Sequence, residues 1–257
     1  MIDKTIKIID MSVSVGKRDS KGRIVTPELL LDMMKTYRID HVVAYHDYAC
    51  LEHKSGNALM KKIADESDGK IGLCVTVDSA LSADSLPGEG SLLARLSASG
   101  AECMRIFPTL DRVTFHPFYL GEIFEAANEL SMPIIIDDTF SVSSPAQFFA
   151  MIPEISKQYP KAKFVVIRYG ICGSRHIFPI VKNCKNVYFT IEKLLDCMQL
   201  EEIFEITGSC DNLLFGSCFP EVPPAGALGT AFYADIPQSE REKILHKNWE
   251  AIRYGNN

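Results

Sequence analysis

Eight short apolar runs alternate with longer stretches of helical periodicity, and this alternation constrains the fold more than any other feature of the chain. Most of the runs are apolar at consecutive positions, which is typical of strands buried on both faces of a parallel sheet. The runs are Ile6–Asp10, His41–Tyr45, Ile71–Val77, Glu102–Phe107, Pro133–Asp137, Lys163–Arg168, Asn186–Ile191 and Leu213–Gly216.

Helical patterns fill the gaps between these runs. The first begins at Thr26-Pro27-Glu28, where a capping hydroxyl precedes a proline and an acid. The others span Gly56–Glu66, Gly90–Ser99, Phe118–Leu130, Pro145–Gln158, Arg175–Asn183, Glu192–Thr207 and Ser239–Asn248. Strict alternation over this length predicts an α/β fold, a single (β/α)8 TIM barrel that spans residues 1–257 as one domain. An open doubly wound sheet is the alternative, but it usually has fewer strands, and no Gly-rich turn follows the first run.

Composition excludes several classes of protein. Apolar residues make up 47% and charged residues 23% of the 257 residues, which is typical of a globular protein. The net charge of −6 argues against binding to nucleic acid or to an anionic membrane. No apolar stretch approaches the roughly 20 residues of a membrane helix, and no signal-peptide pattern begins the chain. The eight cysteines contain no C-x-x-C pair, so we expect reduced thiols and a cytoplasmic protein.

Active sites of such barrels lie at the carboxyl ends of the strands, so the segments after each strand matter most. The longest are Met11–Val25, His46–Ser55, Pro108–Pro117 and Ser217–Gln238. Loops of this length in a compact domain are often functional.

Several segments, in order, resemble the amidohydrolase superfamily, and within it the amidohydrolase-related branch of metal-dependent hydrolases and decarboxylases. They are Ile9-Asp10 with Gly16, Gly100–Ile106, Glu129–Ile136, Phe215–Pro220 and Asn248–Gly255. The resemblance runs almost end to end, and it implies a barrel with its pocket at the mouth.

The resemblance also implies a metal site whose usual ligands are replaced in this chain. Family members place His-x-His after strand 1, one His after each of strands 5 and 6, and an Asp after strand 8. The matching positions here are Ser12, Ser14, Asp137, Arg168 and Cys218. Serine is a poor zinc ligand, and arginine cannot bind a metal. We therefore predict no metal ligands and no cofactor, with an Arg168–Asp137 ion pair in place of the cation.

Two groups of residues are candidates for the site. Asp137, Arg168, Cys218 and His46 are the catalytic candidates, with Cys218 a nucleophile if the charge of Arg168 favours its thiolate. Arg105, Ser12, Ser14, Asp138, Tyr169 and His116 are the candidates for substrate binding. Each has a structural alternative: Cys218 as a core filler, Arg105 in a salt bridge, and His116 as a helix cap. We expect His53 to be a solvated loop histidine.

Three functions remain open from the sequence. The first is a hydrolase or lyase that acts on a small carboxylated or amide substrate without the usual divalent-metal centre. The second is a catalytically inactive pseudoenzyme that binds a small anionic ligand or a partner protein. The third, ranked last, is a hydrolase with a relocated metal held by Asp10, Asp137, Asp138, His46 or Cys218. We expect a small anionic molecule as ligand and, from the resemblance alone, association into a homo-oligomer.

Overall fold

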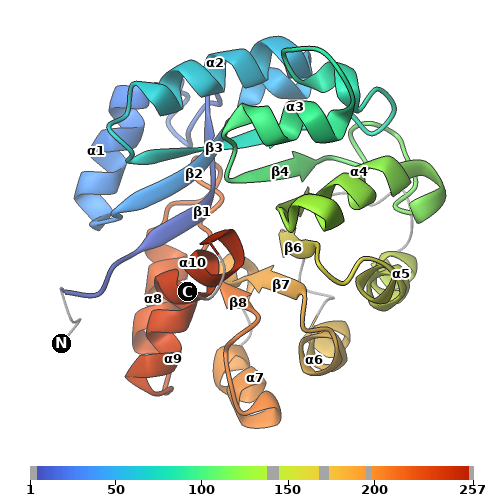
Figure 1. Ribbon diagram of the computed structural model, residues 1–257. Helices are drawn as coiled ribbons and strands as arrows, with labels where there is room; N and C mark the ends of the chain where they lie inside the picture. The colour runs from blue at the N-terminus through green and yellow to red at the C-terminus, as the bar shows by residue number, and fades with distance from the viewer. Residues whose placement is uncertain (1–4, 138–144, 168–173, 195–197, 255–257) are drawn as a thin grey trace.

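The computed structural model describes residues 5–137, 145–167, 174–194 and 198–254 (Figure 1). Its eight strands form one sheet in the order β1 to β8, and each neighbouring pair is parallel. This arrangement confirms the predicted (β/α)8 barrel. The strands are β1 (Ile9–Val15), β2 (His41–His46), β3 (Ile71–Thr76), β4 (Cys103–Ile106), β5 (Pro133–Asp137), β6 (Lys163–Ile167), β7 (Val187–Thr190) and β8 (Leu213–Leu214).

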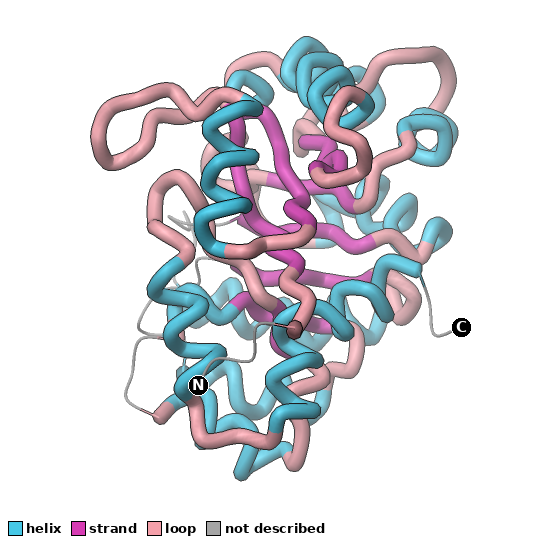
Figure 2. The backbone as a smooth tube through the Cα atoms, turned by 90° about the vertical axis from the view of Figure 1, so that its left-hand side faces the viewer, coloured by secondary structure: helices cyan, strands magenta, loops and turns pink. Residues whose placement is uncertain are grey.

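Helices surround the strands, as the views along and across the barrel show (Figures 1 and 2). The α-helices are α1 (Pro27–Tyr37), α2 (His53–Asp65), α3 (Leu92–Ser99), α4 (Pro117–Leu130), α5 (Pro145–Gln158), α6 (Ser174–Asn183), α7 (Gln199–Thr207), α8 (Ala225–Tyr233), α9 (Gln238–Glu242) and α10 (Asn248–Tyr254). Short helical turns are η1 (Asp47–Cys50), η2 (Ala83–Ser85), η4 (Ile191–Lys193) and η5 (Lys243–Lys247), the last a π-helical turn that joins α9 to α10.

The two ends of the sheet meet through backbone hydrogen bonds that extend beyond the short strand β8. The amide of Met11 donates to the carbonyl of Phe215 at 3.1 Å, and the amide of Ser14 donates to the carbonyl of Phe219 at 2.9 Å. Pairing of β1 with β2 shifts register between Asp10 and Val13. This irregularity lies where β1 enters the mouth of the barrel, the end at which the strands finish.

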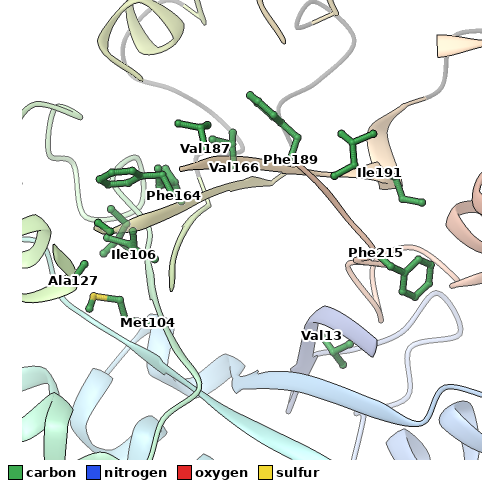
Figure 3. Packing of buried hydrophobic residues seen from close by; sticks show 14 of the residues in the cluster. Val13, Met104, Ile106, Ala127, Phe164, Val166, Val187, Phe189, Ile191 and Phe215 are labelled. Carbon is green, nitrogen blue, oxygen red and sulfur yellow. The ribbon is translucent and has the colours of Figure 1, made fainter. Parts of the chain in front are cut away.

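Alternating side chains of the strands enter two apolar clusters. One cluster lies between strands and helices, and Figure 3 shows Phe164, Phe189 and Phe215 on the outer side of the ring of strands. The other fills the barrel interior with residues such as Tyr45 and Leu214, and Trp249 from α10 packs into it. Because Asn248 donates to the carbonyl of Leu213 at 2.8 Å, α10 lies at the end of the barrel where the strands begin.

Strand β3 separates from β2 near the mouth, and a helix side chain replaces the missing strand partner. The two strands are in register from Val42↔Ile71 to Ala44↔Leu73. Beyond that point Asn57 of α2 accepts from the amide of Thr76 at 2.8 Å. Its Nδ2 donates to the carbonyls of Thr76 and Ser85, both at 2.7 Å. A buried side chain therefore satisfies backbone groups that a neighbouring strand would otherwise satisfy.

The structure corrects several predicted boundaries. The predicted helix Glu192–Thr207 begins only at Gln199, after the turn η4. The predicted loop Ser217–Gln238 contains α8. Strand β1 continues to Val15, five residues past its predicted end at Asp10, because the apolar and small residues that follow Asp10 are all buried. None of the helices in the described part of the chain is long and apolar enough to cross a membrane.

Candidate functional site at the carboxyl ends of the strands

Arg105 lies at the centre of the barrel mouth and links strands on opposite sides. It points inward because β4 alternates, with Met104 and Ile106 in the outer cluster. Its Nη1 donates to Oδ2 of Asp137 at 3.1 Å, and its Nη2 donates to the hydroxyl of Ser12 at 3.0 Å. One guanidinium thus connects β4 with β5 and β1.

Apart from Asp137 and Ser12, the side chains around the guanidinium of Arg105 include two aromatic rings. The residue is 1% exposed, and its guanidinium carbon lies 4.4 Å from the ring centre of Tyr45 and 5.9 Å from that of Phe107. A cation above a ring face is attracted by the ring quadrupole. Because a buried charge is costly unless it is paired and hydrogen-bonded, Asp137, Ser12 and the ring of Tyr45 together make this position tolerable.

Arg168, Asp138 and Tyr169 lie outside the described residues, so the ion pair of Arg168 with Asp137 stays a prediction. Among the described residues Asp137, which is 4% exposed, pairs with Arg105. The sequence analysis left two roles open for Arg105, binding of a substrate anion and a salt bridge. The structure shows a salt bridge, with Asp137. This contact is compatible with a role in binding, which stays a prediction.

The remaining candidates on β1 and after β8 lie beside this pair. The hydroxyl of Ser12 lies 3.5 Å from Sγ of Cys218, and both residues are buried. Cys218 has a φ of 56°, so the chain makes a sharp turn there. Ser14 is also buried. The structure therefore brings Ser12, Cys218, Arg105 and Asp137 together, and the nucleophilic role of Cys218 stays a prediction.

Another buried thiol beside Arg105 belongs to Cys74 of β3. Burial alone would raise the pKa of its thiol, but hydrogen bonding with Cys103 and the charge of Arg105 bring that pKa below the ordinary value. Burial raises the pKa of Cys50, also near the mouth, to about 12. Nothing in the sequence separates these two thiols, because the difference between their pKa values comes from contacts between strands.

His46 and His116 both cap helical turns through Nδ1. In His46 that atom accepts from the amide of Tyr48 at 3.1 Å, and burial lowers the pKa of the imidazole. Its ring packs against Gly16, where a β-carbon would lie 2.7 Å from Cε1 of His46, so this close approach requires glycine. His116 is exposed and accepts from the amide of Phe118 at 3.0 Å. Neither contact tests the catalytic or binding role predicted for these histidines.

Asp10 is a fully buried carboxyl group that fastens β1 to the segment after β8. Its Oδ1 accepts from the amides of Ser217 at 2.9 Å and Ser12 at 3.2 Å. Its Oδ2 has no hydrogen-bond partner among the described residues. Burial raises the pKa of Asp10 to about 7, and hydrogen bonds with Ser217 offset only part of that effect.

The raised pKa of Asp10 predicts a pH-dependent stability. The unfolded value is near 3.8, so the folded protein holds a proton that the unfolded chain releases, and this stabilisation is lost as pH rises from about 4 through about 7. We expect Asp10→Asn, which imitates the protonated carboxyl, to raise the thermal midpoint more at pH 8 than at pH 5. Calorimetry at both pH values measures this, and an equal change at both would contradict the buried titration.

A second polar cluster lies beside Arg105, and the sequence did not predict it. His53 begins α2, and its Nδ1 lies 3.0 Å from the hydroxyl of Thr76, which is the register partner of Arg105 in β4. Its Nε2 lies 3.8 Å from Oδ2 of Asp78 and 4.0 Å from Oδ1 of Asp111. The expectation of a solvated loop histidine is therefore wrong, since the His53 side chain is only 12% exposed.

Comparison with known proteins places this barrel in a structural class. No protein-family model and no curated protein matches the chain. Three solved structures illustrate its similarities. One is 5-carboxyvanillate decarboxylase from Novosphingobium aromaticivorans, with a TM-score of 0.76, 13% identity and 98% of each chain covered. Another is 2,6-dihydroxybenzoate decarboxylase from Rhizobium, with a TM-score of 0.72, 10% identity, and 97% of this chain and 99% of the other covered.

The third is a probable 2-pyrone-4,6-dicarboxylic acid hydrolase from Acinetobacter baumannii with citric acid bound. Its TM-score is 0.70 at 13% identity, with 97% of this chain and 100% of the other covered. At such identities the similarity is one of fold. The chain is a (β/α)8 barrel of the kind found in amidohydrolases. It shares its fold with solved structures named as an amidohydrolase, decarboxylases and a hydrolase, which agrees with the barrel that the resemblance predicted.

Two structures of the Novosphingobium decarboxylase contain manganese. This finding contradicts the sequence prediction of no cofactor, because proteins of this fold do carry a divalent cation. The described residues nevertheless do not fit a cation at the position that the resemblance indicates. The guanidinium of Arg105 lies between Ser12 and Asp137, two of the matching positions. In the part of the chain that the structure describes, no three His, Cys, Asp or Glu side chains are grouped to hold a metal.

Proposed function

We propose that this chain is an enzyme that decarboxylates or hydrolyses a small carboxylated molecule at the carboxyl ends of its strands. The observation that carries the proposal is the buried Arg105 guanidinium at the end of β4, fixed by Asp137 and Ser12. A fixed guanidinium is the side chain best suited to a planar carboxylate. The similarity of fold to two carboxylate decarboxylases and to a probable dicarboxylic acid hydrolase supports the same substrate class.

In this proposal the residues at the mouth orient the substrate. The positive charge of Arg105 attracts the carboxylate, and the rings of Tyr45 and Phe107 form an apolar surface beside it. Low-dielectric surroundings strengthen that attraction. A cation bound elsewhere would supply further charge stabilisation, but no contact described above depends on one.

The test is an assay of the purified full chain with the three acids that the similar structures name. These are 5-carboxyvanillate, 2,6-dihydroxybenzoate and 2-pyrone-4,6-dicarboxylate, each tested with and without added manganese. We expect turnover of at least one acid, measured by release of CO2 or by loss of ultraviolet absorbance. We expect Arg105→Lys, which keeps the charge and loses the two-pronged geometry, to lower kcat/KM by about 10- to 100-fold, on the order of 1–3 kcal/mol.

A pseudoenzyme is the competing function, because hydroxyl groups stand at the two positions of β1 where the resemblance indicates histidines. It predicts binding of one of these acids, measured by calorimetry, with no product in any of the assays. That result would contradict the proposed activity while leaving the mouth as a ligand site.

A further inference from the structure

We propose that His53 is the proton-transfer residue of the barrel mouth, and this inference rests on the function proposed above. His53 is brought to the mouth by the first turn of α2, in the space left where β3 separates from β2. Its partners come from three further places: Thr76 at the end of β3, Asp78 just beyond it, and Asp111 in the loop after β4.

The hydrogen bonds around Asn57 fix which nitrogen of His53 carries the proton. Nδ2 of Asn57 donates to two backbone carbonyls, so its Oδ1 can only accept. That oxygen receives the amide of Thr76 at 2.8 Å and lies 3.3 Å from the hydroxyl of Thr76, which therefore donates to it. The hydroxyl oxygen is then left to accept from Nδ1 of His53. In the neutral imidazole the lone pair must therefore be on Nε2.

Nε2 of His53 faces two carboxylates across gaps that no direct hydrogen bond spans. The distances of 3.8 Å and 4.0 Å exceed hydrogen-bond length, but a single water or substrate hydroxyl can bridge each of them. Asp111 is itself held by Ser79, whose hydroxyl donates to its Oδ2 at 2.7 Å. Burial raises the pKa of Asp111. Two fixed carboxylates therefore lie on the side of the imidazole where Nε2 can exchange a proton with a bridging group.

This arrangement suits both reactions of the proposed function. In decarboxylation the bond between carbon and the carboxyl group breaks and CO2 leaves. The electron pair left on that carbon takes the proton of Nε2, and a proton from solvent restores the imidazolium. In hydrolysis neutral Nε2 takes a proton from the attacking water and returns it to the leaving oxygen. Thr76, the register partner of Arg105 in β4, holds the ring through its contact with Nδ1.

The decisive variant is His53→Asn. The asparagine amide can still donate to Thr76, but the shorter side chain has no atom at the position of Nε2. We expect kcat to fall by about 100-fold or more, with KM within about threefold and the thermal midpoint little changed. His41→Gln is the matched control, since His41 begins β2 at the opposite end of the barrel and its Nε2 bonds to Glu102 at 2.9 Å. We expect that variant to keep wild-type kcat.

A pH profile separates proton transfer from a merely structural role. The groups that face His53 are Asp78, Asp111 and, on its own chain segment, Glu52. Asp111→Asn removes one carboxylate that faces Nε2, so the pH profile of kcat should change, which a merely structural role of His53 would not cause. Turnover that survives His53→Asn, or an unchanged pH profile in Asp111→Asn, would overturn the role of His53 and leave the proposed function standing. A wild-type chain that converts none of the three acids would overturn both.

Discussion

Replacement of Arg105 by methionine is expected to lower the free energy of unfolding by about 3–5 kcal/mol, the usual cost of removing one partner of a buried ion pair. Arg105 and Asp137 have side chains that are 1% and 3% exposed, so water cannot take the place of the lost guanidinium. The buried carboxylate of Asp137 would lose the guanidinium of Arg105, and Ser12 would lose a hydrogen-bond donor.

Urea unfolding followed by circular dichroism measures this loss. Asp137→Asn and the double variant complete a double-mutant cycle. We expect the double variant to lose less stability than the sum of the two single variants, by about 0.5–3 kcal/mol, since either single change already removes the whole interaction between the two side chains. Additive losses, or a loss under about 1 kcal/mol in Arg105→Met, would mean that the pair does not stabilise the mouth.

Replacement of Asn57 by alanine should cost about 3 kcal/mol or more. The change leaves the amide and carbonyl of Thr76 and the carbonyl of Ser85 without their side-chain partner. Each buried polar group left unsatisfied costs about 1–3 kcal/mol. Thr76 is 0% exposed and Ser85 is 2% exposed, so solvent cannot compensate without local opening.

Asn183→Ala is the matched control, because Asn183 is exposed and donates only to the carbonyl of Pro179 within its own helix. We expect that variant to lose less than about 1 kcal/mol. Amide hydrogen exchange gives a local readout: Thr76 should exchange faster in Asn57→Ala and at the wild-type rate in Asn183→Ala. Equal losses of stability in the two variants would contradict the bridging role of Asn57.

The barrel was predictable because most of its strands are continuous runs of apolar residues, which can be recognised in the sequence itself. Pro133–Asp137 matches β5, since a continuous apolar run needs no distant partner to be recognised. The segment after β7 was not predictable in the same way. Glu192–Thr207 has helical composition throughout, yet the helix starts at Gln199, and Met198 before it has a φ of 60°. A left-handed residue at that place is set by the path of the chain and not by its local propensity.

The resemblance predicted which positions lie together at the mouth, but not which side chains they contact. Resemblance pointed to Ser12, Asp137 and Cys218, and the structure brings these residues together around Arg105. His53 was missed because its partners Thr76, Asp78 and Asp111 lie 23 or more positions away in the sequence, on other strands and loops. A pattern of sequence spacing cannot detect such a cluster. The residues come together only because β3 and β4 lie parallel and side by side.

The guanidinium of Arg105 bonds to Ser12 of β1 and to Asp137 of β5, two strands on opposite sides of the ring, so one side chain spans the inside of the barrel. Its hydrogen bonds tie these two walls together at the mouth. An engineer who wished to install a divalent cation here would gain nothing from histidines at positions 12 and 14 alone. Arg105 would first have to be replaced by a shorter side chain. A second substitution would then have to restore the link between β1 and β5.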